Sequence, residues 1–151
     1  MELSNIGMIF GVTLVVVVSA IGIYYLVKGI LPGASVGAVT EPPTSTNGLD
    51  QNQAKFMFFY TTWCPWSKKA QQPWASLKEL HKNTPKTYAG NTVIFEEVNA
   101  ENEEGKAALY GVKAYPTFKL ETKDKVYEML GKPTTANFQT FIKTVLDKKS
   151  S

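Results

Sequence analysis

The sequence predicts an α/β domain with a mixed β-sheet, preceded by an N-terminal apolar segment. Two observations support this prediction. After residue 53, short apolar runs typical of strands alternate with longer amphipathic runs typical of helices, in the order β-α-β-α-β-β-α. Strand–helix alternation that ends in a strand pair and a closing helix indicates a sheet with both parallel and antiparallel neighbours. Ahead of residue 29, one long apolar run stands apart from the rest of the chain.

The apolar run, residues 6–27, is long enough to cross a membrane. It contains 22 residues without one charge, IGMIFGVTLVVVVSAIGIYYLV. A helix of this length covers the roughly 30 Å of a bilayer's hydrocarbon core. Tyr24 and Tyr25 suit the interfacial region. A cleavable signal peptide would have a shorter apolar region behind a basic start, and MELSN has no lysine or arginine. We therefore predict a single-pass transmembrane helix in an anchor of residues 1–28.

Lys28 gives the only indication of sidedness, because it is the one basic side chain next to the span. The positive-inside rule places the following domain in the cytosol. The N-terminal amine opposes this assignment, so a lumenal or extracytoplasmic domain stays open as the alternative.

The segment after the anchor, residues 29–53, is rich in Gly, Pro, Ser, Thr and Asn and has no apolar period. Such a composition is typical of a flexible linker. The remaining residues, 54–151, are enough for one domain with a small core.

The first half of this domain begins with FMFFY, residues 56–60, which predicts a central strand buried on both faces. A helix is expected to start at Pro65 or Trp66, because proline is tolerated in a first turn. It runs towards His81, and Pro73 is expected to kink it.

The second half begins with TVIFEEV, residues 92–98, a second strand, followed by a short helix in EEGKAALYG. Two further strands are predicted, one after Pro116 and one at residues 126–130. Thr134 or Thr135 can cap the closing helix. Its apolar face consists of Phe138, Phe141, Ile142 and Val145.

Composition excludes several functional classes. The net charge of +3 is small and the lysines are scattered, so no nucleic-acid partner is predicted. The single cysteine, Cys64, forbids an intramolecular disulfide.

The single histidine, His81, lies far along the helix from Cys64 and is expected to be a solvated surface residue. Neither a Cys–His catalytic pair nor a metal site is therefore predicted. The acidic residues are expected to be solvated, and no cofactor is predicted. These residues are Glu96, Glu97, Glu101, Glu103 and Glu104.

Two stretches resemble the thioredoxin superfamily. FYTTWCPWS, residues 59–67, is similar to the family's first strand and its Trp-Cys-x-x-Cys site. YGVKAYPTF, residues 110–118, is similar to the family's Tyr-Gly-Val-x-x-x-Pro-Thr segment. The resemblance implies a thioredoxin fold in which Pro116 follows a cis bond and packs beside the active cysteine, Cys64. The segment PTFKLE lacks the Gly-Gly of glutaredoxins, so the domain looks more like those of disulfide isomerases.

The site departs from this family at two positions. Ser67 stands where a dithiol site has its second cysteine, and Phe58 stands where the family has a buried acid. Cys64 at a helix start is a plausible nucleophile, because the helix dipole favours its thiolate. Ser67 can hydrogen-bond that thiolate but cannot resolve a mixed disulfide. An outside thiol such as glutathione would then be needed for release.

Three aromatic residues, Trp63, Trp66 and Tyr115, are expected to surround Cys64. They can form an apolar rim on which an extended client peptide lies, and ordinary packing is the equally weighted alternative. Buried cysteines are also common in cores, where they pack as small hydrophobic residues. Cys64 could have this structural role instead of a chemical one.

Two functions therefore compete. The first is a membrane-tethered monothiol protein that forms mixed disulfides with client proteins, or holds thiol-bearing ones, through Cys64. The second is a redox-inert thioredoxin-fold adaptor or structural module in a membrane-associated complex or a membrane-containing virion. The single cysteine nearly excludes a conventional disulfide oxidoreductase. Because the second cysteine and the buried acid are absent, we do not assign an enzymatic activity in thiol–disulfide exchange.

Overall fold

A computed structural model describes residues 19, 35–43, 47–83, 88 and 90–149. In this part of the chain, the strands are β1 (Ser35–Thr40), β2 (Gln53–Tyr60), β3 (Thr92–Asn99), β4 (Thr117–Thr122) and β5 (Val126–Leu130). The helices are α2 (Pro65–Asn83), α3 (Glu104–Leu109) and α4 (Thr135–Lys149). Every strand and helix predicted after residue 53 is present. Strand β1 was not predicted.

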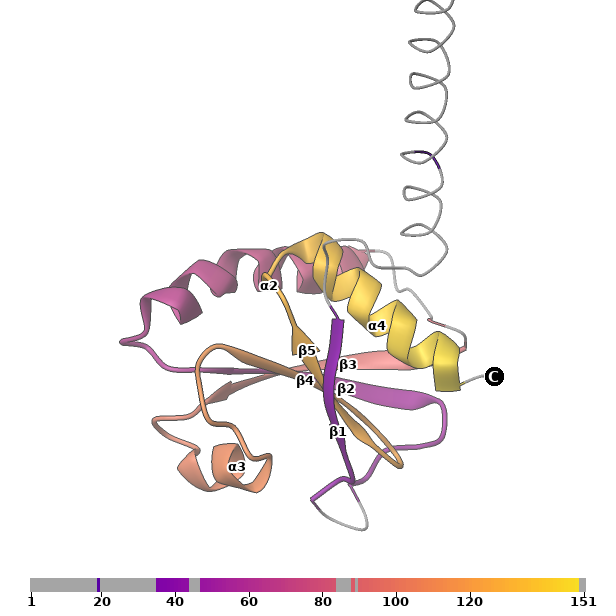
Figure 1. The fold of residues 1–151 in the computed structure, drawn as a ribbon, viewed down its shortest axis with the longest axis horizontal. Helices are drawn as coiled ribbons and strands as arrows, with labels where there is room; N and C mark the ends of the chain where they lie inside the picture. The colour runs from indigo at the N-terminus through magenta and orange to yellow at the C-terminus, as the bar shows by residue number, and fades with distance from the viewer. Residues whose placement is uncertain (1–18, 20–34, 44–46, 84–87, 89, 150–151) are drawn as a thin grey trace, which may run out of the picture. The chain divides into compact units, whose positions relative to one another are not determined.

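The sheet has the strand order β1-β5-β4-β2-β3. Strands β2 and β3 are parallel, and the other neighbours are antiparallel. The predicted mixed sheet is therefore confirmed. Figure 1 shows α2 and α4 on one face of the sheet and α3 on the other, so the domain has three layers.

Strand β2 is buried on both faces, as its apolar run predicts. Phe56 and Phe58 belong to the core on the side of α2 and α4, which also contains Trp74. Met57 and Phe59 belong to a smaller cluster with Ala107 of α3. Because successive side chains of a strand point to opposite faces, one uninterrupted apolar strand supplies both cores.

Strand β1 lies inside the segment predicted as a flexible linker, and that prediction is wrong at residues 35–40. β1 pairs antiparallel with β5 through Ser35–Leu130 to Thr40–Val126, with an irregularity between Val36 and Val39. The irregularity and the small residues hide the strand's period in the sequence. Gly37 has a role here, since a Cβ at this position would lie 2.8 Å from Leu130 Cγ.

The starts of the two long helices follow the sequence signals. Helix α2 begins at Pro65, as predicted. The hydroxyl of Thr134 accepts a hydrogen bond from Asn137 N at 3.2 Å and so caps α4. The hydroxyl of Thr135 donates instead to the carbonyl of Pro73 at 3.2 Å, which ties α4 to α2. The predicted apolar face of α4 is buried.

The predicted transmembrane segment, residues 6–27, lies outside the described residues except for Ser19. Among the helices that the structure describes, none is both long and apolar enough to cross a membrane.

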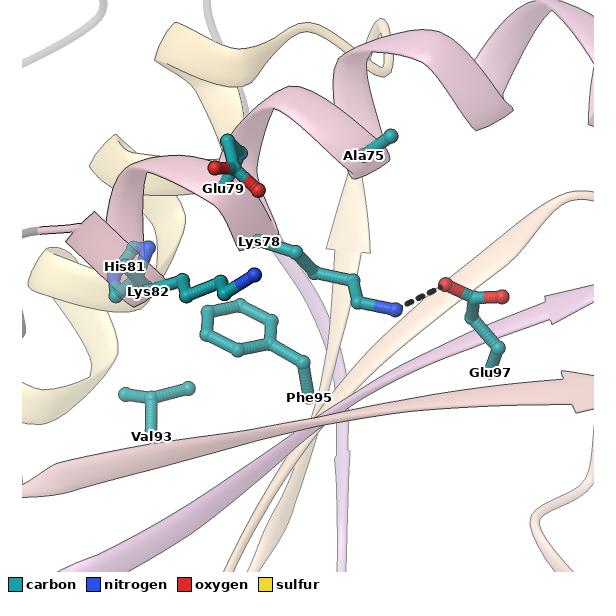
Figure 2. A pocket seen from close by; sticks show the side chains of 8 residues that line it. All are labelled: Ala75, Lys78, Glu79, His81, Lys82, Val93, Phe95 and Glu97. Carbon is teal, nitrogen blue, oxygen red and sulfur yellow. Dashed lines mark hydrogen bonds and ion pairs between the residues drawn. The ribbon is translucent and has the colours of Figure 1, made fainter.

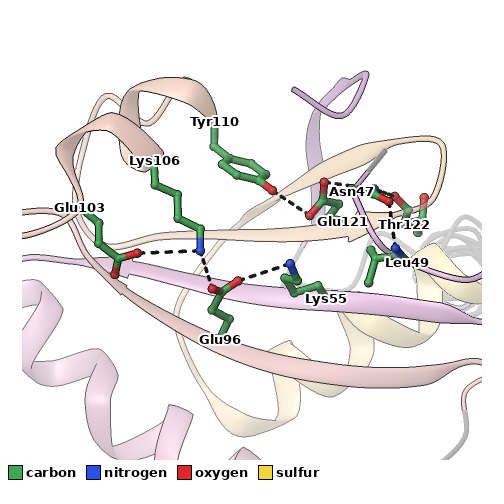
Figure 3. Close-up of polar contacts among 9 residues, drawn as sticks. All are labelled: Asn47, Leu49, Lys55, Glu96, Glu103, Lys106, Tyr110, Glu121 and Thr122. Carbon is green, nitrogen blue, oxygen red and sulfur yellow. Dashed lines mark hydrogen bonds and ion pairs between the residues drawn. The ribbon is translucent and has the colours of Figure 1, made fainter. Parts of the chain in front are cut away.

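A polar network lies on the α3 side of the sheet (Figure 3). Glu121 is fully buried there. Its carboxylate accepts hydrogen bonds from the hydroxyl of Tyr110 at 2.8 Å and from Asn47 Nδ2 at 3.2 Å. Burial, and then the hydrogen bond to Glu121, raise the pKa of Tyr110 well above its usual value, so the phenol keeps its proton. Glu96 forms a second group of polar contacts on this side, through ion pairs with Lys55 and Lys106 (Figure 3).

We predict that Tyr110→Phe lowers the free energy of unfolding by about 1–3 kcal/mol, because it leaves a buried carboxylate short of one donor. Urea unfolding measures this loss. Tyr127→Phe is the matched control: Tyr127 is a half-buried tyrosine on β5 whose hydroxyl forms no hydrogen bond with a described residue. Its effect should stay within about 0.5 kcal/mol. Equal losses in the two variants would contradict the assigned role of Tyr110.

Candidate functional site

Cys64 ends the short loop, residues 61–64, that joins β2 to α2. Its carbonyl accepts the first helical hydrogen bond, from Lys68 N at 3.1 Å, so the side chain stands at the helix N-terminus. The residue is only 6% exposed. The thiol donates to the carbonyl of Tyr115 across 3.5 Å. The Tyr115–Pro116 bond is cis, as predicted. The contact between Cys64 and Tyr115 brings the two sequence motifs together.

The start of α2 stabilises the thiolate of Cys64. Its pKa lies below the usual value, chiefly because the backbone N–H of Ser67 points at the sulfur. Partial burial acts in the opposite direction, and the hydroxyl of Ser67 and the N–H of Trp66 add further donors. Hydrogen-bond donors at a helix N-terminus favour the thiolate form of a cysteine, which is the form that acts as a nucleophile.

The side chain of Ser67 is fully buried. Its hydroxyl oxygen accepts a hydrogen bond from Thr61 N at 3.4 Å, in addition to its contact with the sulfur of Cys64. Ser67 thus occupies the second position of the motif as a structural and electrostatic group. It offers no second sulfur.

The two tryptophans that flank Cys64 are exposed. Trp63 and Trp66 are 67% and 66% exposed, whereas Cys64 between them is nearly covered. The ammonium of Lys69 lies 4.6 Å from the centroid of the Trp66 ring, a cation–π contact. Tyr115 is half-buried and packs on the core cluster at the α3 side. Of the three predicted rim residues, the tryptophans present free aromatic surface, and Tyr115 contributes mainly its carbonyl.

Phe58 fills the position at which the resembled family has a buried acid. It is 1% exposed and stacks on Phe118, with ring centroids 4.9 Å apart and planes 13° apart. Trp74 packs on it at 5.4 Å. The space behind the site is therefore aromatic core.

Glu101 was not predicted to contribute to the site, because the sequence suggested a solvated loop. Its carboxylate accepts hydrogen bonds from Thr62 N at 3.1 Å and from the Thr62 hydroxyl at 2.7 Å. The two residues are 39 positions apart, and no pattern in the sequence links them.

His81 is not the solvated residue that the sequence suggested. Its Nδ1 lies 2.9 Å from the carbonyl oxygen of Leu77, and its Nε2 lies 2.9 Å from the hydroxyl oxygen of Tyr88, both within hydrogen-bond distance. Phe95 packs on the ring at 4.7 Å. Leu80, one position earlier, is exposed instead. The helix therefore turns its histidine, and not this leucine, towards the sheet.

A shallow groove of about 640 Å³ lies beside His81, between α2 and β3 (Figure 2). Lys78 reaches across it to the carboxylate of Glu97, 2.7 Å away. None of its lining residues belongs to the Cys64 site. In the part of the chain that the structure describes, no group of three or more acidic, histidine or cysteine side chains is placed to hold a metal ion.

Comparison with known proteins identifies the fold. The family model described as Thioredoxin matches residues 44–144. Human ERp44 in its zinc-bound form is similar, with 20% identity and a TM-score of 0.56, over 68% of this chain and 30% of the ERp44 chain. The Trx4 domain of ERdj5 has 19% identity and a TM-score of 0.54, over 71% of this chain and 92% of that domain.

A third similar structure is the first thioredoxin domain of mouse protein disulfide-isomerase A4, with 20% identity and a TM-score of 0.52, over 64% of this chain and 65% of that one. At these identities the likeness concerns the fold alone. The chain spans less than a third of the ERp44 chain that it matches. No curated protein sequence matches this one.

We predict that Ser67→Ala raises the pKa of Cys64 towards its usual value, because one donor to the thiolate is lost while the backbone donors stay. The reaction of Cys64 with iodoacetamide, followed against pH, reports this shift, and at neutral pH the variant should react more slowly. Ser76→Ala removes an exposed hydroxyl of the same helix and should leave the profile unchanged. An unchanged profile for Ser67→Ala would mean that the hydroxyl does not act on the sulfur.

Proposed function

The chain belongs to the thioredoxin family, and on this premise we propose that it is a membrane-tethered monothiol protein that captures client proteins on Cys64. The observation that carries the proposal is the pairing of a stabilised Cys64 thiolate with a fully buried serine at the second motif position. Such a site retains the nucleophile of a thioredoxin and lacks the group that completes its cycle.

The reaction follows from this pairing. The Cys64 thiolate attacks one sulfur of a client disulfide, forms a Cys64–client disulfide and releases the client's other sulfur as a thiolate. In a dithiol site, the second cysteine then attacks the sulfur of the first cysteine and frees the client. The hydroxyl of Ser67 cannot form a disulfide, so the mixed disulfide lasts until an outside thiol such as glutathione attacks it.

The surface around Cys64 suits a protein client. Trp63 and Trp66, one residue before and two residues after the nearly covered Cys64, are both largely exposed. Exposed aromatic side chains are favourable contacts for peptide segments, because they bury a large area at low cost in conformational entropy. We therefore assign client binding to these tryptophans. The carbonyl of Tyr115 accepts the hydrogen bond of the protonated thiol.

The competing function is a redox-inert adaptor. The observation in its favour is the low exposure of Cys64 together with the aromatic packing of Phe58, since both also suit a packed structural site. An adaptor would bind its partners without a covalent bond, and its role would survive the loss of the thiol.

We predict that the parent chain traps partners in disulfide-linked complexes, visible on a non-reducing gel of an acid-quenched lysate and identifiable by mass spectrometry. Ser67→Cys should trap fewer, because attack by a neighbouring thiol outpaces external thiols. Cys64→Ala should trap none. If the parent traps nothing and Cys64→Ala keeps the biological role, the adaptor function replaces the monothiol one.

The membrane tether is a separate prediction. We expect the full-length chain to stay with membranes in alkaline carbonate, because residues 6–27 would form a spanning helix. A chain that starts at residue 35 serves as the control and should be released. Release of the full-length chain would contradict the anchor without bearing on the chemistry of Cys64.

A further inference from the structure

We propose that Glu101 is a positioning residue for Cys64 and that it acts by clamping Thr62. The carboxylate takes both hydrogen-bond donors of Thr62: Oε2 lies 3.1 Å from the backbone nitrogen and 2.7 Å from the hydroxyl, and Oε1 lies 3.1 Å from the hydroxyl. Thr62 stands two residues before Cys64 in the loop that joins β2 to α2. This inference rests on the proposed reactivity of Cys64.

The clamp is anchored to the sheet. Glu101 N donates to Asn99 Oδ1 at 3.0 Å, and Glu103 N donates to the Asn99 carbonyl at 2.8 Å, so the turn after β3 is hydrogen-bonded within itself. Ala100 N donates to the carbonyl of Tyr60 at 2.9 Å, which joins this turn to the last residue of β2. The carboxylate therefore projects from a fixed frame onto the loop.

The loop is held from its other side by α2. Thr61 N donates to the hydroxyl of Ser67, whereas the buried hydroxyl of Thr61 has no hydrogen-bond partner among the described residues. Among the described residues, the side chains that hydrogen-bond to the loop between β2 and Cys64 are thus those of Ser67 and Glu101. Among the described residues, no hydrogen bond joins Glu101 to the sulfur or to its donors, so its effect on Cys64 runs through the backbone of Thr62.

The geometry at Cys64 depends on this loop. The sulfur is stabilised by the N–H groups of Ser67 and Trp66, which are fixed in the first turn of α2. A looser loop lets the sulfur move away from these donors and into solvent. The thiol then ionises at higher pH, and its fully ionised form reacts faster with a small reagent because it is less covered.

The direction of the change separates a clamp from a plain charge. Removing a nearby negative charge favours a thiolate and lowers the pKa of Cys64. Removing a clamp raises that pKa. Thr62→Val supplies the second arm, because it removes the hydroxyl donor at nearly constant volume and leaves the charge of Glu101 in place.

The experiment follows the alkylation of Cys64 by iodoacetamide against pH in the full chain, for Glu101→Ala, Thr62→Val and the double variant. We expect each single variant to raise the midpoint of the profile and to increase the limiting rate constant roughly two- to tenfold, the range of an ordinary net hydrogen-bond contribution at a solvent-exposed site. The double variant should go no further than Glu101→Ala alone, since both remove one interaction. Glu101→Gln, which keeps an acceptor without the charge, should lie nearer the parent.

Glu104→Ala is the matched control. Glu104 is an exposed acid in the first turn of α3, and it has no hydrogen bond to the loop among the described residues. It should leave the profile unchanged, and urea unfolding midpoints check that each variant is folded at the assay conditions. If Glu101→Ala fails to fold, Thr62→Val and Glu101→Gln carry the comparison.

Three results would overturn the clamp: a lowered midpoint in Glu101→Ala with no change in Thr62→Val, additive effects in the double variant, or profiles equal to the parent's. These results are distinguishable from failure of the proposed function. If the proposed function fails, Cys64 of the parent chain traps no client. The alkylation profiles of the variants still report whether Glu101 positions the sulfur.

Discussion

The burial of β2 on both faces is the constraint from which the rest of the site follows. Its register with β4 places Phe59 opposite Thr117, so the end of β2 meets the start of β4. Cys64 follows β2 and Pro116 precedes β4, and the two motifs therefore meet although 51 positions separate Cys64 from Tyr115. A slip of one residue would turn the phenylalanines of one core towards the other face.

The parts of the fold that the sequence predicted are those with local signals. Five large apolar residues, a proline at a helix start and threonines before an amphipathic run each determine their own element. The edge strand β1 escaped prediction because its hydrogen bonds are with β5, far away in the chain, and its small residues show no period. Glu101 and His81 were misjudged for the same reason, since their partners, Thr62 and Tyr88, are set by tertiary structure.

The lowered pKa of Cys64 comes from the start of α2, and no lysine is among its causes. Lys69 lies over the ring of Trp66, and the donors that lower the pKa of the thiol are groups in the first turn of α2. The lowered pKa of the thiol thus comes from the helix and its serine. The buried space that would otherwise hold an acid is filled by Phe58 and contributes to the core.

Strand β1 also changes the reach of the protein. A linker of residues 29–53 would be 25 residues long, but pairing of β1 with β5 leaves only the seven residues 28–34 between the proposed membrane span and the sheet. Seven residues extend to at most about 25 Å. If residues 6–27 span a bilayer, a tether of this length favours clients at the same membrane, because it raises their local concentration around Cys64.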